Sequence, residues 1–249
     1  MTTVSLQHPS IAARERPEAH QAWLARFPWI GAALIVVGLA AFALLLFSVE
    51  TQGFLTALDA PIDTALHARV TNDPGWLVLT WRALAVLGRE AILVAAVSLG
   101  LYWFWRRRWR ELAMVALGVG GGEPIFEVLS RLIDRHRPVW PNYIEFLPGP
   151  GFPSGHVMSA ILFYGMIAYL LLPRLRSRGW RVLAFVDAAL LALVVGFSRL
   201  YIGLHWPTDV LAGAAWGAVC AFTALAVARR AVGPAPGAGE ASGPRGEGE

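Results

Sequence analysis

The sequence predicts an all-α protein that folds as a bundle of six transmembrane helices. The chain of 249 residues is 56% hydrophobic and only 15% charged, which is too apolar for an ordinary soluble domain of this length. Each of its six apolar segments has about 17–21 residues, close to the ~20 that a helix needs to cross a ~30 Å hydrocarbon core. The segments lack the alternation of barrel strands, so helices are the expected spanning structure.

The apolar segments lie, in chain order, at roughly 29–49, 87–105, 111–130, 156–173, 181–198 and 208–228. The second has no sharp boundary, because Arg89 and Glu90 fall near its start. Residues 76–87 carry apolar residues at mixed spacing, which fits either an interfacial helix or an extension of the second span. We therefore predict a polar N-terminal tail over 1–27, a six-span domain over 28–230 and a disordered C-terminal tail over 231–249, which is rich in Gly, Pro, Ala, Ser and Glu.

Charge bias predicts how the bundle is oriented. All 21 basic residues are arginine, and four clusters of them lie before the first span, between the second and third, between the fourth and fifth, and after the sixth. With six spans these clusters share one side, which the positive-inside rule makes cytoplasmic. Both termini are then cytoplasmic, and loops 131–155 and 199–207 face the extracytoplasmic side. The clusters indicate membrane topology rather than nucleic-acid binding. The single cysteine, Cys220, excludes an intramolecular disulfide and a Cys-rich metal site.

A polar motif, Ser198-Arg199-x5-His205-x3-Asp209, joins the fifth and sixth spans. Pro207 fits the first turn of a helix and marks the start of the sixth span. Asp209 is near enough to reach one imidazole nitrogen of His205, which would leave the other nitrogen free as a nucleophile or base. The planar fork of Arg199 matches two phosphate oxygens. An interfacial His–Asp pair that only satisfies a helix start is the alternative interpretation.

A second motif, Pro153-Ser154-Gly155-His156, opens the fourth span. Ser154 is expected to cap this helix, and the free N–H groups of its first turn would form an anion site. Gly155 allows an oxyanion to approach the backbone closely. His156 would point to the same mouth, where it could protonate a leaving oxygen. An ordinary helix start with an interfacial histidine is an equally good interpretation of this motif alone.

Three arginines, Arg131, Arg135 and Arg137, follow the third span on the side that the orientation rule leaves poor in positive charge. Anion binding gives a reason for them to be there. The residue before a proline is disfavoured in helical geometry, so Arg137 lies where the helix ends and the chain turns before Pro138. For Arg131 we favour contact with lipid headgroups.

These residues resemble the type 2 phosphatidate phosphatase superfamily, which also includes vanadium-dependent haloperoxidases. The family pattern is Lys-x6-Arg-Pro, then Pro-Ser-Gly-His, then Ser-Arg-x5-His-x3-Asp, and the resemblance covers roughly residues 85–228. It implies a six-span bundle with the active site at the extracytoplasmic membrane surface. It also implies that His205 is the nucleophile, oriented by Asp209, and that His156 is the general acid. The phosphoryl oxygens would be held by Arg137, Arg199 and the Ser154–Gly155 turn.

The first block departs from the family pattern, because Ser130 occupies the position of the family lysine. Arg131 is adjacent, but one helical step rotates a side chain by ~100°. Arg135, two residues before Arg137, is the other candidate for the missing cation. The sequence leaves open which of these two arginines contacts phosphate.

The resemblance implies an integral membrane phosphatase that hydrolyses a lipid phosphomonoester or diphosphate through a phosphohistidine. Phosphatidate, phosphatidylglycerol phosphate and a polyprenyl diphosphate all fit an active site that opens beside lipid. No metal or other cofactor is expected, the expected partners are the bilayer and the lipid substrate, and the oligomeric state stays open.

Three alternatives remain at this point. A lipid phosphotransferase would share the same phospho-enzyme step. His156, His205 and Asp209 could instead form a zinc site, although the surrounding arginines favour an anion. A non-catalytic protein that binds or translocates lipid is the third, since Glu123 and Glu127 place ionisable groups within the third span.

Overall fold

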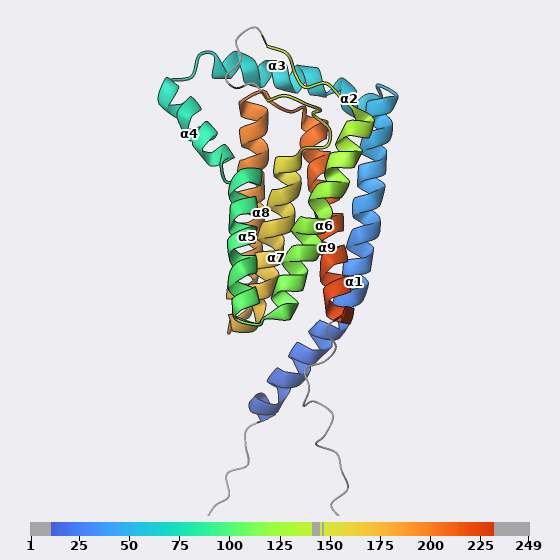
Figure 1. Ribbon diagram of the computed structural model, residues 1–249, viewed down its shortest axis with the longest axis vertical. Coiled ribbons are helices and arrows are strands. Elements are labelled where there is room, and N and C mark those ends of the chain that lie inside the picture. The colour runs from blue at the N-terminus through green and yellow to red at the C-terminus, as the bar shows by residue number, and fades with distance from the viewer. Residues whose placement is uncertain (1–10, 141–144, 146, 232–249) are drawn as a thin grey trace, which may run out of the picture.

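The computed structural model describes residues 11–140, 145 and 147–231, which fold into helices and connecting turns with no β-strand among them. Six helical stretches are long and apolar enough to cross a membrane, as the sequence predicts. They run side by side along the long axis of the molecule (Figure 1). They are formed by α1 (Ile11–Glu50), α4 (Gly75–Ala85) together with α5 (Arg89–Trp105), α6 (Trp109–Ile133), α7 (Gly155–Leu171), α8 (Arg178–Tyr201) and α9 (Pro207–Ala231).

Helix α1 extends into the predicted N-terminal tail. Helix α1 begins at Ile11, so the helix continues through 11–27 before its membrane-spanning part, Trp29–Glu50. The segment 11–27 contains several Ala, Arg and Glu, which are good helix formers. Residues 1–10 and most of the predicted C-terminal tail, 232–249, lie outside the described residues.

The second span is built from two helices rather than one. Helix α4 is separated from α5 by Val86–Gly88, and in Figure 1 the two helices differ in direction. The break leaves backbone carbonyls available. Ala85 O accepts the N–H of Gly88 at 3.0 Å, and Leu87 O accepts the Tyr164 hydroxyl at 2.6 Å. Residues 76–87 therefore form mainly a separate helix joined to the span.

Helix α7 lies at the centre of the bundle, where it packs against α5, α6, α8 and α9, while α1 packs along α9. Leu162 and Met166 of α7 share a core cluster with Met114 of α6, and all three are fully buried. Gly118 allows α6 to approach closely, because a Cβ there would lie 2.6 Å from the sulfur of Met166. Gly118 thus serves helix packing at this point.

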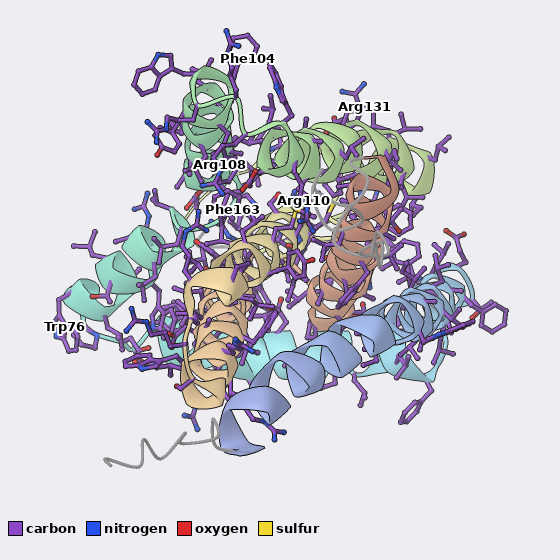
Figure 2. All side chains as sticks on the ribbon, turned by 90° about the horizontal axis from the view of Figure 1, so that it is seen from below. Trp76, Phe104, Arg108, Arg110, Arg131 and Phe163 are labelled. Carbon is purple, nitrogen blue, oxygen red and sulfur yellow. The ribbon has the colours of Figure 1, made fainter. Side chains whose placement is uncertain are left out.

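Two short helices, α2 (Phe54–Ala57) and α3 (Asp59–Val70), connect α1 to α4. Helix α3 lies across one end of the bundle, above the points where α7 and α9 begin (Figure 1). The arginine-rich connections between α5 and α6 and between α7 and α8 lie at the other end, which faces the viewer in Figure 2. One end of the bundle therefore carries the arginine-rich connections, and the other end, which α3 covers, carries the polar motifs.

Candidate active site

The three polar motifs meet at the end of the bundle beneath α3. The Ser154 N–H donates to the carbonyl of Asp209 at 2.9 Å, which joins the start of α7 to the start of α9. The Gly151 N–H donates to the carbonyl of Arg135 at 2.7 Å, which joins the loop before α7 to the segment after α6. Gly213 is also required at this junction, since a Cβ there would overlap the carbonyl oxygen of Ser154.

His205 lies in the turn between α8 and α9 and is only 1% exposed. Its Nδ1 is 2.8 Å from the carbonyl oxygen of Gly151, and its Nε2 is 2.9 Å from Nη1 of Arg137. A carbonyl can only accept and a guanidinium can only donate. The two contacts therefore fix the neutral tautomer, in which Nδ1 carries the proton and the lone pair of Nε2 accepts the hydrogen bond from Arg137.

The surroundings of His205 also keep its ring uncharged. Burial lowers its pKa to about 4, and the positive charge of Arg137 acts in the same direction, while Asp209 opposes it. A positive charge on His156 would lower this pKa further. At neutral pH the Nε2 nitrogen is therefore unprotonated.

Asp209 is fully buried near His205, but the contact differs from the predicted pair. Its Oδ2 is 3.6 Å from Nδ1 of His205, and the hydrogen bond of Nδ1 goes to Gly151 instead. Oδ2 accepts the backbone N–H of Trp206 at 2.9 Å, which caps the start of α9. Oδ1 is 2.5 Å from Nη1 of Arg135. Asp209 therefore acts on His205 mainly through its charge and by fixing the turn.

Arg137 is held in place almost entirely by backbone oxygens. Its guanidinium donates to the carbonyls of Gly149, Pro150 and Leu204 at 3.1, 2.8 and 2.8 Å. Burial lowers its pKa to about 10, with Asp209 opposing and Arg199 reinforcing this shift, so the group stays positive at neutral pH. Arg137 also lines a cavity of about 200 Å³ between the loop and the turn before α9. The guanidinium lies beside Nε2 of His205, so an anion that binds Arg137 would lie close to that nitrogen.

Two buried polar groups of the motifs have no hydrogen-bond partner among the described residues: Nε of Arg199 and the hydroxyl of Ser154. Nη2 of Arg199 donates to the carbonyl of Ala85 at 2.9 Å, which anchors the fork at the break between α4 and α5. Ser154 occupies the N-cap position of α7, yet its hydroxyl makes no capping bond, contrary to the prediction. Unpartnered donors in a buried site are costly, and phosphate oxygens would satisfy them.

Gly155, the other residue of the predicted phosphate turn, lies directly against Phe126 of α6. A Cβ at this position would be 2.7 Å from the ring, so only glycine fits. The first turn of α7 can therefore pack tightly on α6 while its N–H groups face the loop end of the bundle.

His156 follows in the first turn of α7 and is buried beside α5. Its Nε2 is 3.1 Å from Oε2 of Glu90, whose side chain is 66% exposed. Gly88 lies against the ring, because a Cβ there would be 2.7 Å from Cδ2 of His156. Sequence reasoning missed both Gly88 and Glu90. The only available signal was a charged pair at the start of an apolar span.

The two arginines proposed to replace the family lysine behave differently from that expectation. Arg131 is 74% exposed, binds Glu127 at 2.8 Å and projects from the outer side of α6 (Figure 2). Arg135 has a side chain that is 12% exposed and lies between two carboxylates, 2.7 Å from Asp59 and 2.5 Å from Asp209. Neither arginine offers a free guanidinium to phosphate, and Ser130 is buried in α6.

Glu123 and Glu127, which favoured a transport function, are paired with arginine in the structure. Arg89 lies 2.9 Å from Glu123 and 3.7 Å from Glu127, and Glu123 also accepts the hydroxyl of Ser159. Pairing accounts for ionisable groups at this depth without a translocation pathway. The zinc alternative needs His156, His205 and Asp209 together, but no group of three potential ligands is assembled in the described part of the chain.

Comparisons with known proteins identify the family of this chain. The sequence model of the PAP2 superfamily matches residues 125–232. Phosphatidylglycerophosphatase B of Bacillus subtilis is 32% identical over 192 residues, which cover 73% of this chain and 88% of the relative. Lipid A 1-phosphatase of Rhizobium johnstonii is 33% identical over 172 residues, 64% of each chain. Undecaprenyl-diphosphatase of Sulfolobus acidocaldarius is 32% identical over 154 residues, 58% of this chain and 67% of the relative.

A solved structure supports the same assignment. The crystal structure of a transmembrane PAP2 type phosphatidylglycerolphosphate phosphatase from Bacillus subtilis superposes with a TM-score of 0.65 at 28% sequence identity. The superposition covers 76% of this chain and 94% of the crystallised one. With six membrane-spanning helices and these relatives, the chain is an integral membrane protein that belongs to the PAP2 superfamily.

Proposed function

We propose that the protein hydrolyses a lipid phosphomonoester or diphosphate by two displacements at phosphorus, with a phosphohistidine between them. The observation that carries this proposal is the state of His205. Its Nδ1–H is bound to Gly151 O, and its Nε2 lone pair lies beside Nη1 of Arg137. A nucleophile, Nε2 of His205, therefore lies next to a cation, Arg137, that can bind the phosphoryl oxygens.

In the first step, phosphate oxygens bind Arg137, the free Nε of Arg199 and the Ser154 hydroxyl. Nε2 of His205 forms a bond to phosphorus while the bond from phosphorus to the leaving oxygen breaks. His156 gives its proton to that oxygen. Glu90 lies 3.1 Å from Nε2 of His156, so its carboxylate can accept the N–H of the ring and orient the imidazole.

In the second step, water attacks the phosphohistidine and His156 takes a proton from it. The bond from phosphorus to Nε2 breaks, phosphate leaves and His205 returns to its neutral form. No step in this sequence uses a metal ion, so we expect full turnover after exhaustive chelation with EDTA.

The substrate is proposed to be a lipid because the site lies at the end of a membrane-spanning bundle. The relatives named for phosphatidylglycerophosphate, lipid A and undecaprenyl diphosphate support this class. We further propose that this end is extracytoplasmic and that both termini are cytoplasmic, since the arginine-rich connections lie at the other end. A membrane-impermeant substrate should then be cleaved by intact spheroplasts and not by inverted vesicles.

The test is release of phosphate by purified protein in detergent from phosphatidate, phosphatidylglycerol phosphate and a polyprenyl diphosphate. The unmodified protein should release free phosphate from at least one, whereas His205→Ala and His156→Ala should release none. Turnover by either variant would refute the role assigned to that residue. A phosphorylated acceptor in place of free phosphate would identify a phosphotransferase instead.

A further inference from the structure

Asp59, on the short helix α3, reaches the start of α9 and joins a buried network there. The residue is only 2% exposed. Its Oδ1 accepts the backbone N–H of Thr208 at 2.9 Å, and its Oδ2 accepts the Thr208 hydroxyl at 2.6 Å. Oδ2 also lies 2.7 Å from Nη2 of Arg135. One carboxylate thus holds both a helix start and an arginine from the segment after α6.

Arg135 continues the network toward the nucleophile. Its Nη1 donates to the Thr208 hydroxyl at 2.7 Å and to Oδ1 of Asp209 at 2.5 Å. The guanidinium plane therefore lies between the two carboxylates, with one nitrogen committed to each. A planar fork held at both nitrogens cannot rotate without breaking one of these charge-assisted bonds.

The same contacts fix the carboxylate of Asp209. With Oδ1 on Arg135, Oδ2 is left to the Trp206 N–H at 2.9 Å and to Nδ1 of His205 at 3.6 Å. Rotation of this carboxylate would change its distance to the imidazole and release the turn that carries His205.

We propose that Asp59 and Arg135 are positioning residues for the nucleophile, which act on His205 by fixing Asp209. The proposal rests on the proposed phosphatase function, and it gives Arg135 a different task from binding phosphate. Asp59 lies outside residues 125–232, which the family sequence model matches, so a helix outside that region would contribute to catalysis. If Asp59 and Arg135 only stabilised the fold, their replacement would leave the protonation of the His205 imidazole unchanged.

Because Asp59 and Arg135 carry opposite charges, we expect their replacement to change the pKa of His205 in opposite directions. The groups that act on its ring are Arg137, Asp209 and His156, together with the carbonyl of Gly151. Removing the negative charge in Asp59→Asn leaves Arg135 paired with Asp209 alone, so the ring becomes harder to protonate. Removing the positive charge in Arg135→Gln frees Asp209, so the ring becomes easier to protonate.

The experiment measures kcat, KM and the acid limb of kcat/KM for both variants, with whichever lipid phosphate the unmodified protein cleaves. We expect kcat to fall on the order of 10-fold or more in each, with KM changed by less than about 3-fold. The acid limb should move to lower pH in Asp59→Asn and to higher pH in Arg135→Gln. The double variant should lose less than the product of the single losses, because both act through one carboxylate.

Asp134→Asn is the matched control, since it removes an exposed carboxylate next to Arg135 that takes no part in the network. Its kcat and acid limb should equal those of the unmodified protein. If Asp59→Asn does not fold, Arg135→Lys retains the charge with one donor group, and should lower kcat without moving the limb.

Unchanged kcat and limb in Asp59→Asn would overturn the inference, as would shifts of both limbs in the same direction. The proposed function would remain intact in that case, because it depends on the loss of turnover in His205→Ala.

Discussion

Nη1 of Arg137 lies 2.9 Å from Nε2 of His205, so a positive charge that can bind a substrate anion lies next to this imidazole nitrogen. The same guanidinium is oriented by three backbone carbonyls. Lysine keeps the charge but cannot reproduce this planar set of donors. We expect Arg137→Lys to lower kcat/KM by about 10²-fold, a loss of ~2.7 kcal/mol of transition-state stabilisation. Steady-state phosphate release measures the effect, and a variant within 2-fold of the unmodified protein would contradict it.

The low pKa of His205, about 4, predicts the acid limit of activity. The ring must be neutral to attack, and it is neutral above this value. We expect kcat/KM to fall as the pH drops through about 4, rather than near the ordinary histidine value of ~6.5. A pH profile measured with a substrate whose own ionisation is known checks this. An acid limb at 6.5 that belongs to the enzyme would show that the ring is solvated.

Gly88 should be irreplaceable because of the ring that it contacts. The Cβ of Gly88→Ala would lie 2.7 Å from Cδ2 of His156 and 3.0 Å from Ala85 O, so the imidazole must shift. We expect kcat to fall at least 10-fold, since the proton donor moves away from the leaving oxygen. Gly120→Ala in α6, where an added Cβ meets nothing within 4 Å, is the matched control and should retain activity.

The leaving group provides a second measurement on the Gly88 variant. A substrate with a good leaving group, such as p-nitrophenyl phosphate, needs little protonation. If His156 is displaced as expected, the variant should lose much less activity on this substrate than on a lipid phosphate. Equal losses on both substrates would indicate damage to phosphate binding instead.

Arg131 and Arg199 should differ sharply, although both belong to the polar motifs. Arg131 is exposed and paired with Glu127, whereas Nε of Arg199 is buried and unpartnered among the described residues. We expect Arg131→Gln to keep kcat/KM within about 2-fold, as for many exposed ion pairs. Arg199→Gln should lose at least 10²-fold. Comparable losses in the two variants would show that Arg131 reaches the substrate.

Asp63 of α3 predicts a dependence of stability on pH. Burial raises its pKa to about 7, and the charges of Asp59 and Asp209 add to this, while Trp140 partly opposes it. A carboxyl group that is protonated when folded stabilises the protein at low pH, and this stabilisation is lost as the pH rises from about 4 to about 7. Allowing for solvent screening, we expect Asp63→Asn to be more stable at pH 8 by about 1–2 kcal/mol.

Thermal inactivation in detergent tests this expectation for Asp63→Asn. Its midpoint should exceed that of the unmodified protein at pH 8, and the gain should be much smaller at pH 4. A variant less stable at pH 8 would show that the carboxylate is stabilised by a contact other than those described.

The six spans could be predicted from the sequence because each needs only length and hydropathy, which are local properties. The positions of His205, His156 and Arg137 at helix ends also followed from Pro and Gly near each motif. The roles of Arg131 and Arg135 did not follow, since spacing does not reveal which way a side chain points after a helix ends. Asp134 ends α6 in a left-handed conformation, φ +47°, and redirects Arg135 toward Asp59.

Two further features had no signal that sequence reasoning could use. The partner of Nδ1 in His205 is the backbone carbonyl of Gly151, and any residue type carries such a carbonyl. Asp59 belongs to no motif, and its contact with Thr208 spans 149 positions in the chain. Tertiary packing alone brings these groups to the site.

The interruption at Val86–Gly88 has a consequence for how such a span can evolve. In an unbroken helix the oxygens of Ala85 and Leu87 would serve the helix's own ladder, whereas here they hold Arg199 and Tyr164. A continuous helix through this segment would therefore remove the hydrogen-bond acceptor of Arg199 without altering any of the motif residues. A sequence change at Val86–Gly88, outside the three motifs, would then lower activity while every motif residue stays unchanged.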